Sequence, residues 1–257
     1  MTTEKVFTGI ETDYSFFMSH STEAASVLDC LCSESFRSVI NQSNTILDFG
    51  GGDGEFTENV FKKINLSPEM VMLVEPAASY HEKWIERLRG MSQCLSTQTS
   101  IDTVNDKSVE LIIANHVLYY VGDLSRVIEE HKRISKADAF AIYSMASVNN
   151  SLIKMWDIGF EAGLDMNTPY NSAPALEAML RLKEISCEPH LVQSEFVCSD
   201  TKENRSKLLR FLFKDHLSKF KSEGKISLDA FLNKHSLDGK LKLPLEDWVY
   251  LVNLGDK

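Results

Sequence analysis

Residues 47–54 read Leu-Asp-Phe-Gly-Gly-Gly-Asp-Gly and continue a short apolar run that starts at Thr45. Apolar side chains then recur with the spacing of one helical face, at Phe56, Val60, Phe61 and Ile64. Glycines between a strand and a helix let the backbone turn tightly and approach a ligand closely. The stretch therefore predicts a strand, a ligand-binding turn and a helix, in that order.

The alternation of strand and helix continues on the C-terminal side of this stretch. Further apolar runs at 71–74, 111–114 and 139–145 predict strands, and helical spacing follows the first two of them. Alternation of this kind produces βαβ units with right-handed crossovers. We therefore expect an α/β fold whose sheet is mostly parallel.

Charge and cysteine content exclude several classes of protein. The chain has 27 Lys and Arg residues against 37 Asp and Glu, a formal charge of −10, which argues against binding to nucleic acid or to anionic membranes. Five scattered cysteines without a CxxC pair favour free thiols in a reducing compartment. The polar start, Met1–Lys5, does not resemble a signal peptide, and no apolar run approaches the roughly 20 residues that cross a bilayer. We expect a soluble, cytoplasmic monomer.

The glycine turn distinguishes between three kinds of nucleotide ligand. A Walker loop needs a lysine that is missing here, and the dinucleotide pattern GxGxxG fails because Glu55 and Thr57 occupy its last position in the two registers. An acidic turn repels a pyrophosphate but suits a ligand without phosphate, such as S-adenosylmethionine. Glu75 lies 21 residues after Gly54, at the end of the second strand, where its carboxylate can accept both ribose hydroxyls. The alternative is a structural glycine turn with a capping glutamate.

With these features the chain resembles the class I S-adenosylmethionine-dependent methyltransferases from about Ile46 to Met145. The resemblance implies a Rossmann-like sheet of seven strands with helices on both faces and an antiparallel last strand. It also implies that the glycine turn faces the methionine moiety and that Thr99 and Ser100, or Asp102, lie near the adenine. The predicted cofactor-binding residues are Asp48, Gly50, Gly51, Gly52, Gly54, Glu75, Pro76, Tyr80, Thr99, Ser100, Asn115 and His116.

The resemblance also divides the chain into parts of one domain, residues 1–257. We expect a cofactor-binding core at 45–145 and a last strand at 246–254. The mostly helical segments 8–42 and 150–235, the second interrupted by a strand at 190–198, are expected to cover the substrate.

Outside the core the chain is similar to the histamine N-methyltransferases. The similarity lies in Phe16–Glu23, which contains His-Ser-Thr-Glu, and in Val74-Glu75-Pro76, residues 118–121 and the region of Trp156. In that family a glutamate at the position of Glu23 contacts the substrate amine. A glutamine holds the place of His116 and an asparagine that of Asp247, so the hydrogen bonds to the substrate must differ here. Two carboxylates favour a cationic or hydrogen-bond-donating amine.

The resemblance and the residue chemistry together suggest an acceptor site. Glu23, His116 and Asp247 are the candidate catalytic residues, because an amine nucleophile must lose a proton before it attacks. Aromatic neighbours, Trp248 among them, could surround the nucleophile and the sulfonium. The predicted substrate-binding residues are Glu23, Tyr14, Phe17, Tyr119, Tyr120, Trp156 and Asp247. No metal is expected, since His81-Glu82 lacks the second histidine of HExxH.

Each of these residues also has a structural interpretation. Glu23 suits the first turn of a helix capped by Ser21, and His116 suits a structural position after a strand. Tyr119, Tyr120 and Trp248 are of the kind that fills hydrophobic cores.

Transfer of a methyl group to the amine nitrogen of a small molecule is the expected activity. Two alternatives stay open: O-methylation of a small carboxylate or phenol, and a cofactor-binding partner protein without catalysis. An NAD-linked oxidoreductase is disfavoured by the failed dinucleotide pattern.

Overall fold

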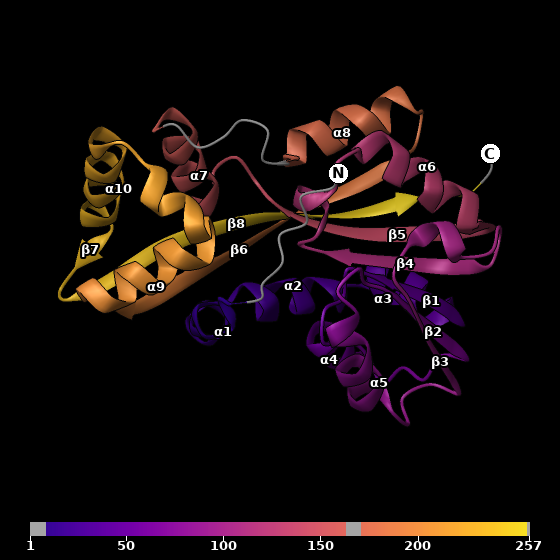
Figure 1. The fold of residues 1–257 in the computed structure, drawn as a ribbon. Helices are drawn as coiled ribbons and strands as arrows, with labels where there is room; N and C mark the ends of the chain where they lie inside the picture. Colours follow the sequence, from indigo (N-terminus) through magenta and orange to yellow (C-terminus); the bar gives the residue numbers. More distant parts are fainter. Residues whose placement is uncertain (1–8, 163–170, 256–257) are drawn as a thin grey trace.

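The computed structural model describes residues 9–162 and 171–255 (Figure 1). Within these residues the strands form one sheet in the order β3-β2-β1-β4-β5-β8-β6, and the two-residue β7 pairs with β8. The strands are β1 (Thr45–Phe49), β2 (Met70–Val74), β3 (Cys94–Gln98), β4 (Val109–Asn115), β5 (Ser135–Ala146), β6 (Cys187–Ser199), β7 (Ser236–Leu237) and β8 (Lys240–Asn253).

The direction of the strands confirms the expected Rossmann-like fold. Strands β3, β2, β1, β4 and β5 pair in parallel, whereas β8 runs antiparallel to both β5 and β6. The antiparallel last strand is therefore present, and the short β7 is an addition to the seven strands that were expected. β8 begins at Lys240, earlier than residue 246, because Leu241, Leu243 and Leu245 alternate with exposed neighbours and extend the strand.

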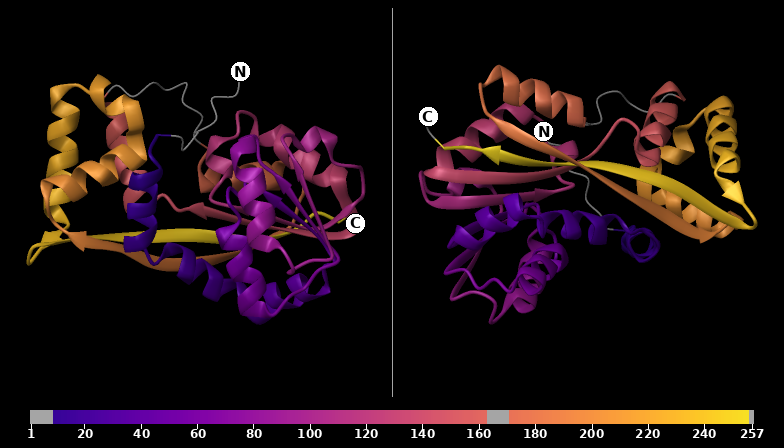
Figure 2. Two further views of the ribbon diagram at one scale, coloured as in Figure 1. Left: turned by 60° about the horizontal axis from the view of Figure 1, so that its bottom comes forward. Right: turned by 180° about the vertical axis from the view of Figure 1, so that it is seen from behind.

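Helices cover both faces of the sheet (Figures 1 and 2). The α-helices are α1 (Glu11–His20), α2 (Glu23–Leu31), α3 (Glu34–Gln42), α4 (Glu55–Ile64), α5 (His81–Leu88), α6 (Leu124–Ile134), α7 (Ser151–Glu161), α8 (Ala173–Leu182), α9 (Lys202–Phe213) and α10 (Ser222–Lys234). Short 3₁₀ turns lie at η1 (Ala78–Tyr80), η2 (Ile101–Thr103), η3 (Leu118–Tyr120) and η4 (Lys214–Lys219).

Alternate side chains of the central strands fill two separate cores. In β1, Ile46 packs with the apolar faces of α2, α3, α4 and α5, whereas Leu47 packs with those of α6 and α8 on the opposite face. Both side chains are fully buried. This burial on both faces explains why the strand reads as a continuous apolar run rather than an alternating one.

A third core lies away from these two. β6 and β8 form a long two-stranded ribbon that extends past the rest of the sheet, and α7, α9 and α10 gather over its far end (Figure 1). α1 is attached to α9 by Arg210, whose guanidinium donates to both carboxylate oxygens of the buried Asp13 over 2.8 Å each. Helical segments thus lie where substrate covers were expected; that they cover a substrate stays a prediction. Residues 163–170 of the expected insertion, and Met1–Lys5, lie outside the described residues.

None of the helices within residues 9–162 and 171–255 is both long and apolar enough to cross a membrane.

Candidate active site

The glycine turn joins β1 to α4 and lies at the carboxyl edge of the sheet. Gly50, Gly52 and Gly54 have φ angles of 69°, 56° and 83°, in the left-handed region that side chains disfavour. The Gly50 amide donates to the Val74 carbonyl over 2.8 Å and so ties the turn to the end of β2. A Cβ atom on Gly52 would meet no described heavy atom within 4 Å, so the backbone there is open to a ligand.

The buried side chain of Asp48 packs against the glycine turn. Its Oδ2 atom accepts hydrogen bonds from Thr57 Oγ1 over 2.8 Å and from Trp84 Nε1 over 2.9 Å. A Cβ atom on Gly51 would overlap the Asp48 carboxylate, so this position has room only for glycine. Burial raises the pKa of Asp48 to about 6, although the two hydrogen bonds act to lower it. Asp48 thus holds the turn in shape, and its predicted contact with the cofactor stays a prediction.

Gly54 provides a test of the turn. Its Cβ atom would lie 2.7 Å from Trp84 Cδ1, in addition to the strain of a φ angle of 83°. We expect Gly54→Ala to weaken S-adenosylhomocysteine binding at least tenfold and to lower the free energy of unfolding by about 1–3 kcal/mol. Calorimetric titration and urea unfolding measure the two effects.

A matched control separates strain from the contact with Trp84. Gly90 has the same φ angle of 83°, but no described atom lies within 4 Å of the position of its Cβ. Gly90→Ala should therefore lose stability through strain alone and keep its ligand affinity. Equal losses of affinity in the two variants would contradict the role given to the turn.

The ends of β2 and β3 bring further predicted residues to the same edge of the sheet. Glu75 follows β2 directly, and its Oε1 atom accepts the Ala77 amide over 3.0 Å. Burial and the charge of Glu75 both raise the pKa of Tyr80. After β3, Ser100 caps the short turn η2 by accepting the Asp102 amide over 3.3 Å. Pro76 and Thr99 are exposed.

The end of β4 contributes two adjacent residues. The buried Oδ1 atom of Asn115 and the Nε2 atom of His116 have no hydrogen-bond partner among the described residues. His116 also has a φ angle of 51°, unusual for a residue with a side chain. Unpartnered buried polar atoms are rare in folded proteins, and strained residues gather at functional sites. Both observations favour a ligand at this edge.

Arg87 reinforces the turn and was not singled out in the sequence. Its guanidinium donates to the Asp53 carbonyl over 3.0 Å and to the Asp53 carboxylate over 2.8 Å, which fastens the turn to α5. Arg87 has the helical spacing of an ordinary solvent-exposed arginine, so only the structure shows this contact.

Three residues that are distant in the sequence meet beside this edge. A carboxylate oxygen of Glu23, a carboxylate oxygen of Asp247 and a ring nitrogen of His116 all lie within 4.8 Å of one another. The Nε2 atom of His116 is 3.9 Å from Oε2 of Glu23. Glu23 begins α2, His116 follows β4, and Asp247 pairs with Ala146 of β5 in the register of β8. We call these three residues the acceptor cluster.

Neighbouring polar groups orient two members of the acceptor cluster. Asn150 is fully buried, and its Nδ2 atom donates to Oδ1 of Asp247 over 3.1 Å. The Nδ1 atom of His116 lies 3.1 Å from the Tyr119 hydroxyl, which also accepts the Ala146 amide. The second Asp247 oxygen, Oδ2, has no partner among the described residues. Asn150 was missed in the sequence, where it stands in an ordinary turn before α7.

The electrostatics of the cluster follow from its burial. Burial raises the pKa of Glu23 to about 7. Burial raises the pKa of Asp247 to about 7 as well, and the charge of Glu23 adds to this rise while His116 and Asn150 oppose it. Burial lowers the pKa of His116, opposed by the charge of Asp247. Near pH 7 the cluster therefore combines a neutral imidazole with carboxyl groups close to their midpoint of ionisation.

The aromatic residues predicted to bind substrate fall into two groups. Burial, and then nearby charges that include Glu23, raise the pKa of the Tyr14 and Tyr120 phenols. Phe17 stacks on Phe211 at 4.5 Å, and Trp156 packs against Phe213, both within the third core. The structure does not bring Phe17 or Trp156 to the acceptor cluster through any of these contacts.

Two further aromatic residues belong to the framework of the sheet. Tyr119 supports His116 through its hydroxyl, and Trp248 packs against the core that contains Tyr250.

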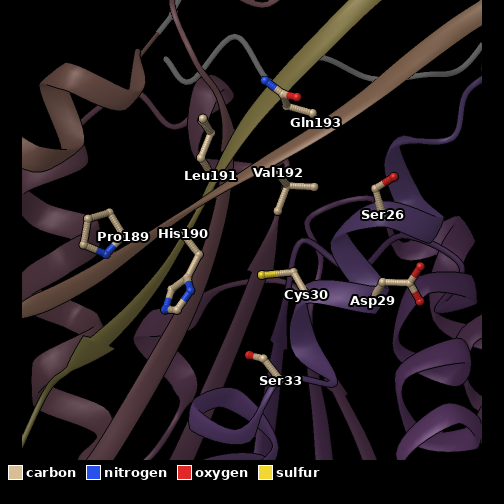
Figure 3. Close-up of a pocket in the computed structure, with 9 residues that line it drawn as sticks. All are labelled: Ser26, Asp29, Cys30, Ser33, Pro189, His190, Leu191, Val192 and Gln193. Atoms are coloured by element: carbon tan, nitrogen blue, oxygen red, sulfur yellow. The ribbon is translucent and has the colours of Figure 1, made fainter.

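A surface groove of about 590 Å³ lies elsewhere, between α2 and β6 (Figure 3). Figure 3 shows Ser26, Asp29 and Cys30 on one side and Pro189 to Gln193 on the other. Burial raises the pKa of the Cys30 thiol, which disfavours the reactive thiolate. The groove contains none of the predicted site residues.

Comparison with known proteins identifies the family. A family model described as a methyltransferase domain matches residues 27–182 of the chain. The chain belongs to the methyltransferase family. More closely, it is a class I S-adenosylmethionine-dependent methyltransferase, as the sequence predicted. A comparison with proteins of curated function finds no match.

Solved methyltransferase structures share the fold. A candidate methyltransferase of Bacillus halodurans superposes with a TM-score of 0.59 at 13% identity over 91% of this chain and 100% of that one. A second structure comes from a Thermotoga maritima protein described as an S-adenosylmethionine-dependent methyltransferase and a candidate histamine N-methyltransferase. It superposes with a TM-score of 0.52 at 15% identity, over 96% of both chains. A candidate sarcosine dimethylglycine methyltransferase of Galdieria sulphuraria superposes with a TM-score of 0.55 at 15% identity, over 89% of this chain and 85% of that one.

The family implies S-adenosylmethionine as the cofactor, and the residues at the sheet edge fit it. The open backbone at Gly52 leaves room for the ligand, and Glu75, which directly follows β2, would accept the ribose hydroxyls. The unpartnered Oδ1 atom of Asn115 is a further acceptor at the same edge. These residues would hold a nucleoside without phosphate groups.

Proposed function

We propose that this methyltransferase transfers the methyl group of S-adenosylmethionine to an amine nitrogen of a small molecule. The acceptor cluster carries the proposal, because it gathers two buried carboxylates and a neutral imidazole beside the cofactor edge. No Lys or Arg of the described residues forms an ion pair with Glu23 or Asp247. Negative charge without a protein partner favours a cationic or hydrogen-bond-donating ligand.

The same charges disfavour the alternative acceptors. A carboxylate substrate would bring a third negative charge next to Glu23 and Asp247, which repels it. A phenol would need a base to remove its proton but would offer no positive charge to the carboxylates. The acceptor cluster is therefore better suited to an amine than to O-methylation.

The chain's own residues have to position the nitrogen and take up its proton. S-adenosylmethionine, when bound, supplies a methyl group on a positively charged sulfur. Glu23 and Asp247 bind the amine, and its proton passes to one of them or to His116, which leaves a neutral nitrogen with a free lone pair. The nearby helices exclude water and align the nitrogen, which accounts for most of the rate.

A binding experiment and a product screen test this proposal. We expect calorimetric titration to show binding of S-adenosylhomocysteine but not of NAD. Mass spectrometry should then show methyl transfer to small amines, and not to matched carboxylic acids or phenols. Glu23→Gln, His116→Ala and Asp247→Asn should each lower kcat on the best amine. Unchanged rates in all three variants would refute the roles given to the cluster.

A further inference from the structure

The distances between the three polar atoms of the acceptor cluster limit the ligands that can bind to it. Its three polar atoms come from three distant parts of the chain, and all of them lie within 4.8 Å of one another. All three side chains are mostly buried: Glu23 and His116 keep 12% and 18% of their side-chain exposure, and Asp247 keeps none. Glu23 and His116 are therefore partly exposed, whereas Asp247 is fully buried.

The spacing matches one kind of nitrogen. An ammonium group that donates three N–H bonds of about 2.9 Å in tetrahedral directions requires acceptors about 4.7 Å apart. Separations of up to 4.8 Å, and the 3.9 Å between His116 and Glu23, can both be met by such a group. Hydrogen bonds tolerate the difference between these values through modest changes in angle.

A metal ion is the competing ligand for the same atoms. Donor atoms of zinc are at most about 4.2 Å apart and those of a larger ion such as calcium up to about 5 Å. The three atoms lie within 4.8 Å of one another, so the experiment has to separate a metal ion from an ammonium ion.

The hydrogen-bonding state of the three residues supports the same ligand. Oδ2 of Asp247 and Nε2 of His116 have no partner among the described residues, although both atoms are buried. In the tautomer with its proton on Nδ1, His116 donates to the Tyr119 hydroxyl, whose second lone pair receives the Ala146 amide. Nε2 then presents a lone pair, and with both carboxyl groups ionised the cluster offers three acceptors and no donor.

We propose that the acceptor is a primary amine, bound as its ammonium ion with one N–H to each of Glu23, His116 and Asp247, and that it receives a single methyl group. This inference rests on the proposed function and specifies its substrate class.

The chemical step limits the product. The bound ammonium loses one proton to the cluster and turns about its C–N bond, so that its lone pair points between two acceptors toward the methyl group. The lone pair then forms the new N–C bond while the C–S bond breaks and its electron pair stays on sulfur. The product is a secondary ammonium with only two N–H groups. Once the cluster has passed the proton on to solvent, one of its three buried acceptors lacks a donor and faces a methyl group, which weakens binding about tenfold. The product therefore leaves rather than reacting again.

The test uses methylated ammonium ions, which are small and differ mainly in their number of N–H groups. Protein labelled with ¹⁵N-histidine is titrated with methylammonium, dimethylammonium and trimethylammonium chloride at constant ionic strength, and the His116 ring signal, identified by its loss in His116→Gln, is followed. We expect affinity to fall about tenfold at each added methyl group. Glu23→Gln and Asp247→Asn should remove the preference, while Glu34→Gln, an exposed glutamate on α3, should keep it.

Three results would overturn the inference. They are an absent response to methylammonium, an affinity that stays equal or rises toward trimethylammonium, and a stronger response of the ring to equimolar zinc chloride that Asp247→Asn abolishes. The titration needs neither a methyl donor nor turnover. Loss of S-adenosylhomocysteine binding would therefore refute the proposed function separately. Equal affinities for the three methylated ammonium ions would refute only the primary-amine inference.

Discussion

At pH 8 the Asp247→Asn variant is expected to be more stable than the wild-type protein and to have lost almost all activity. Asp247 is fully buried, and burial is the main reason that its pKa rises to about 7. In the unfolded chain an aspartate ionises near pH 3.9. Between these values the folded protein keeps a proton that the unfolded chain has released, so wild-type stability falls as pH rises from about 4 to about 7.

The variant escapes this loss because asparagine does not ionise. Its Oδ1 atom can still accept the hydrogen bond from Asn150, so the framework stays intact. We expect the free energy of unfolding at pH 8 to exceed the wild-type value by about 2 kcal/mol, and the difference to shrink toward pH 5. The groups that face Asp247 are Glu23, His116 and Glu246, and the substitution also relieves the repulsion from the two glutamates.

Activity should change in the opposite direction. The variant loses a charge that binds the ammonium ion and one of the groups that can take up its proton, so kcat/KM should fall about 100-fold or more. Urea unfolding at pH 5 and pH 8, together with steady-state kinetics, measures both effects. Asp138→Asn, on an exposed residue of β5, is the matched control and should change neither quantity. Normal activity with unchanged stability would show that Asp247 is not a buried, ionisable substrate ligand.

A gain in stability with a loss of activity is what a binding site predicts and a structural site does not. A carboxylate that served only the fold would be paired, and its removal would destabilise the protein. Asp247 keeps one oxygen without a partner among the described residues and lies close to a second carboxylate. We therefore expect this arrangement to lower the stability of the protein, which is a common feature of sites that bind charged ligands.

Local patterns in the sequence predicted the cofactor edge. The apolar run, the glycine turn and the amphipathic helix after it are neighbours along the chain, so their spacing determines their geometry. The sequence pattern did not single out β3 as a strand, because Cys-Leu-Ser-Thr-Gln contains few apolar residues and pairs only with β2 at the edge of the sheet. Its position was implied only by the resemblance to the class I methyltransferases.

Local sequence patterns could not predict that the acceptor cluster forms. Glu23, His116 and Asp247 are separated by more than ninety residues each, and only the strand order brings them together. Resemblance to the histamine N-methyltransferases singled them out, whereas Asn150 carried no signal. The rings of Phe17 and Trp156 pack in the third core, and their contact with the substrate stays a prediction. An aromatic residue on a helix shows the same spacing in both cases, so sequence cannot separate the two roles.

The second large effect is expected at Glu75, where Glu75→Ala should weaken S-adenosylhomocysteine binding about 100-fold. A carboxylate that accepts both ribose hydroxyls forms two charge-assisted hydrogen bonds, and losing such bonds costs about 1.5–3 kcal/mol each. Calorimetric titration measures the change directly and needs no acceptor. Glu82→Gln, on an exposed residue of α5, should leave the affinity unchanged.

Glu75→Gln distinguishes the hydroxyl contacts from the shape of the loop. Oε1 of Glu75 also accepts the Ala77 amide, so the alanine variant removes a loop contact together with the carboxylate. Glutamine retains one carbonyl oxygen for Ala77 but presents a neutral amide where the second oxygen stood. If ribose binding depends on the charge and on both oxygens, the glutamine variant should lose affinity about tenfold with unchanged thermal stability. An affinity within threefold of wild type in both variants would mean that the ribose lies elsewhere, and the cofactor site at the end of β2 would have to be abandoned.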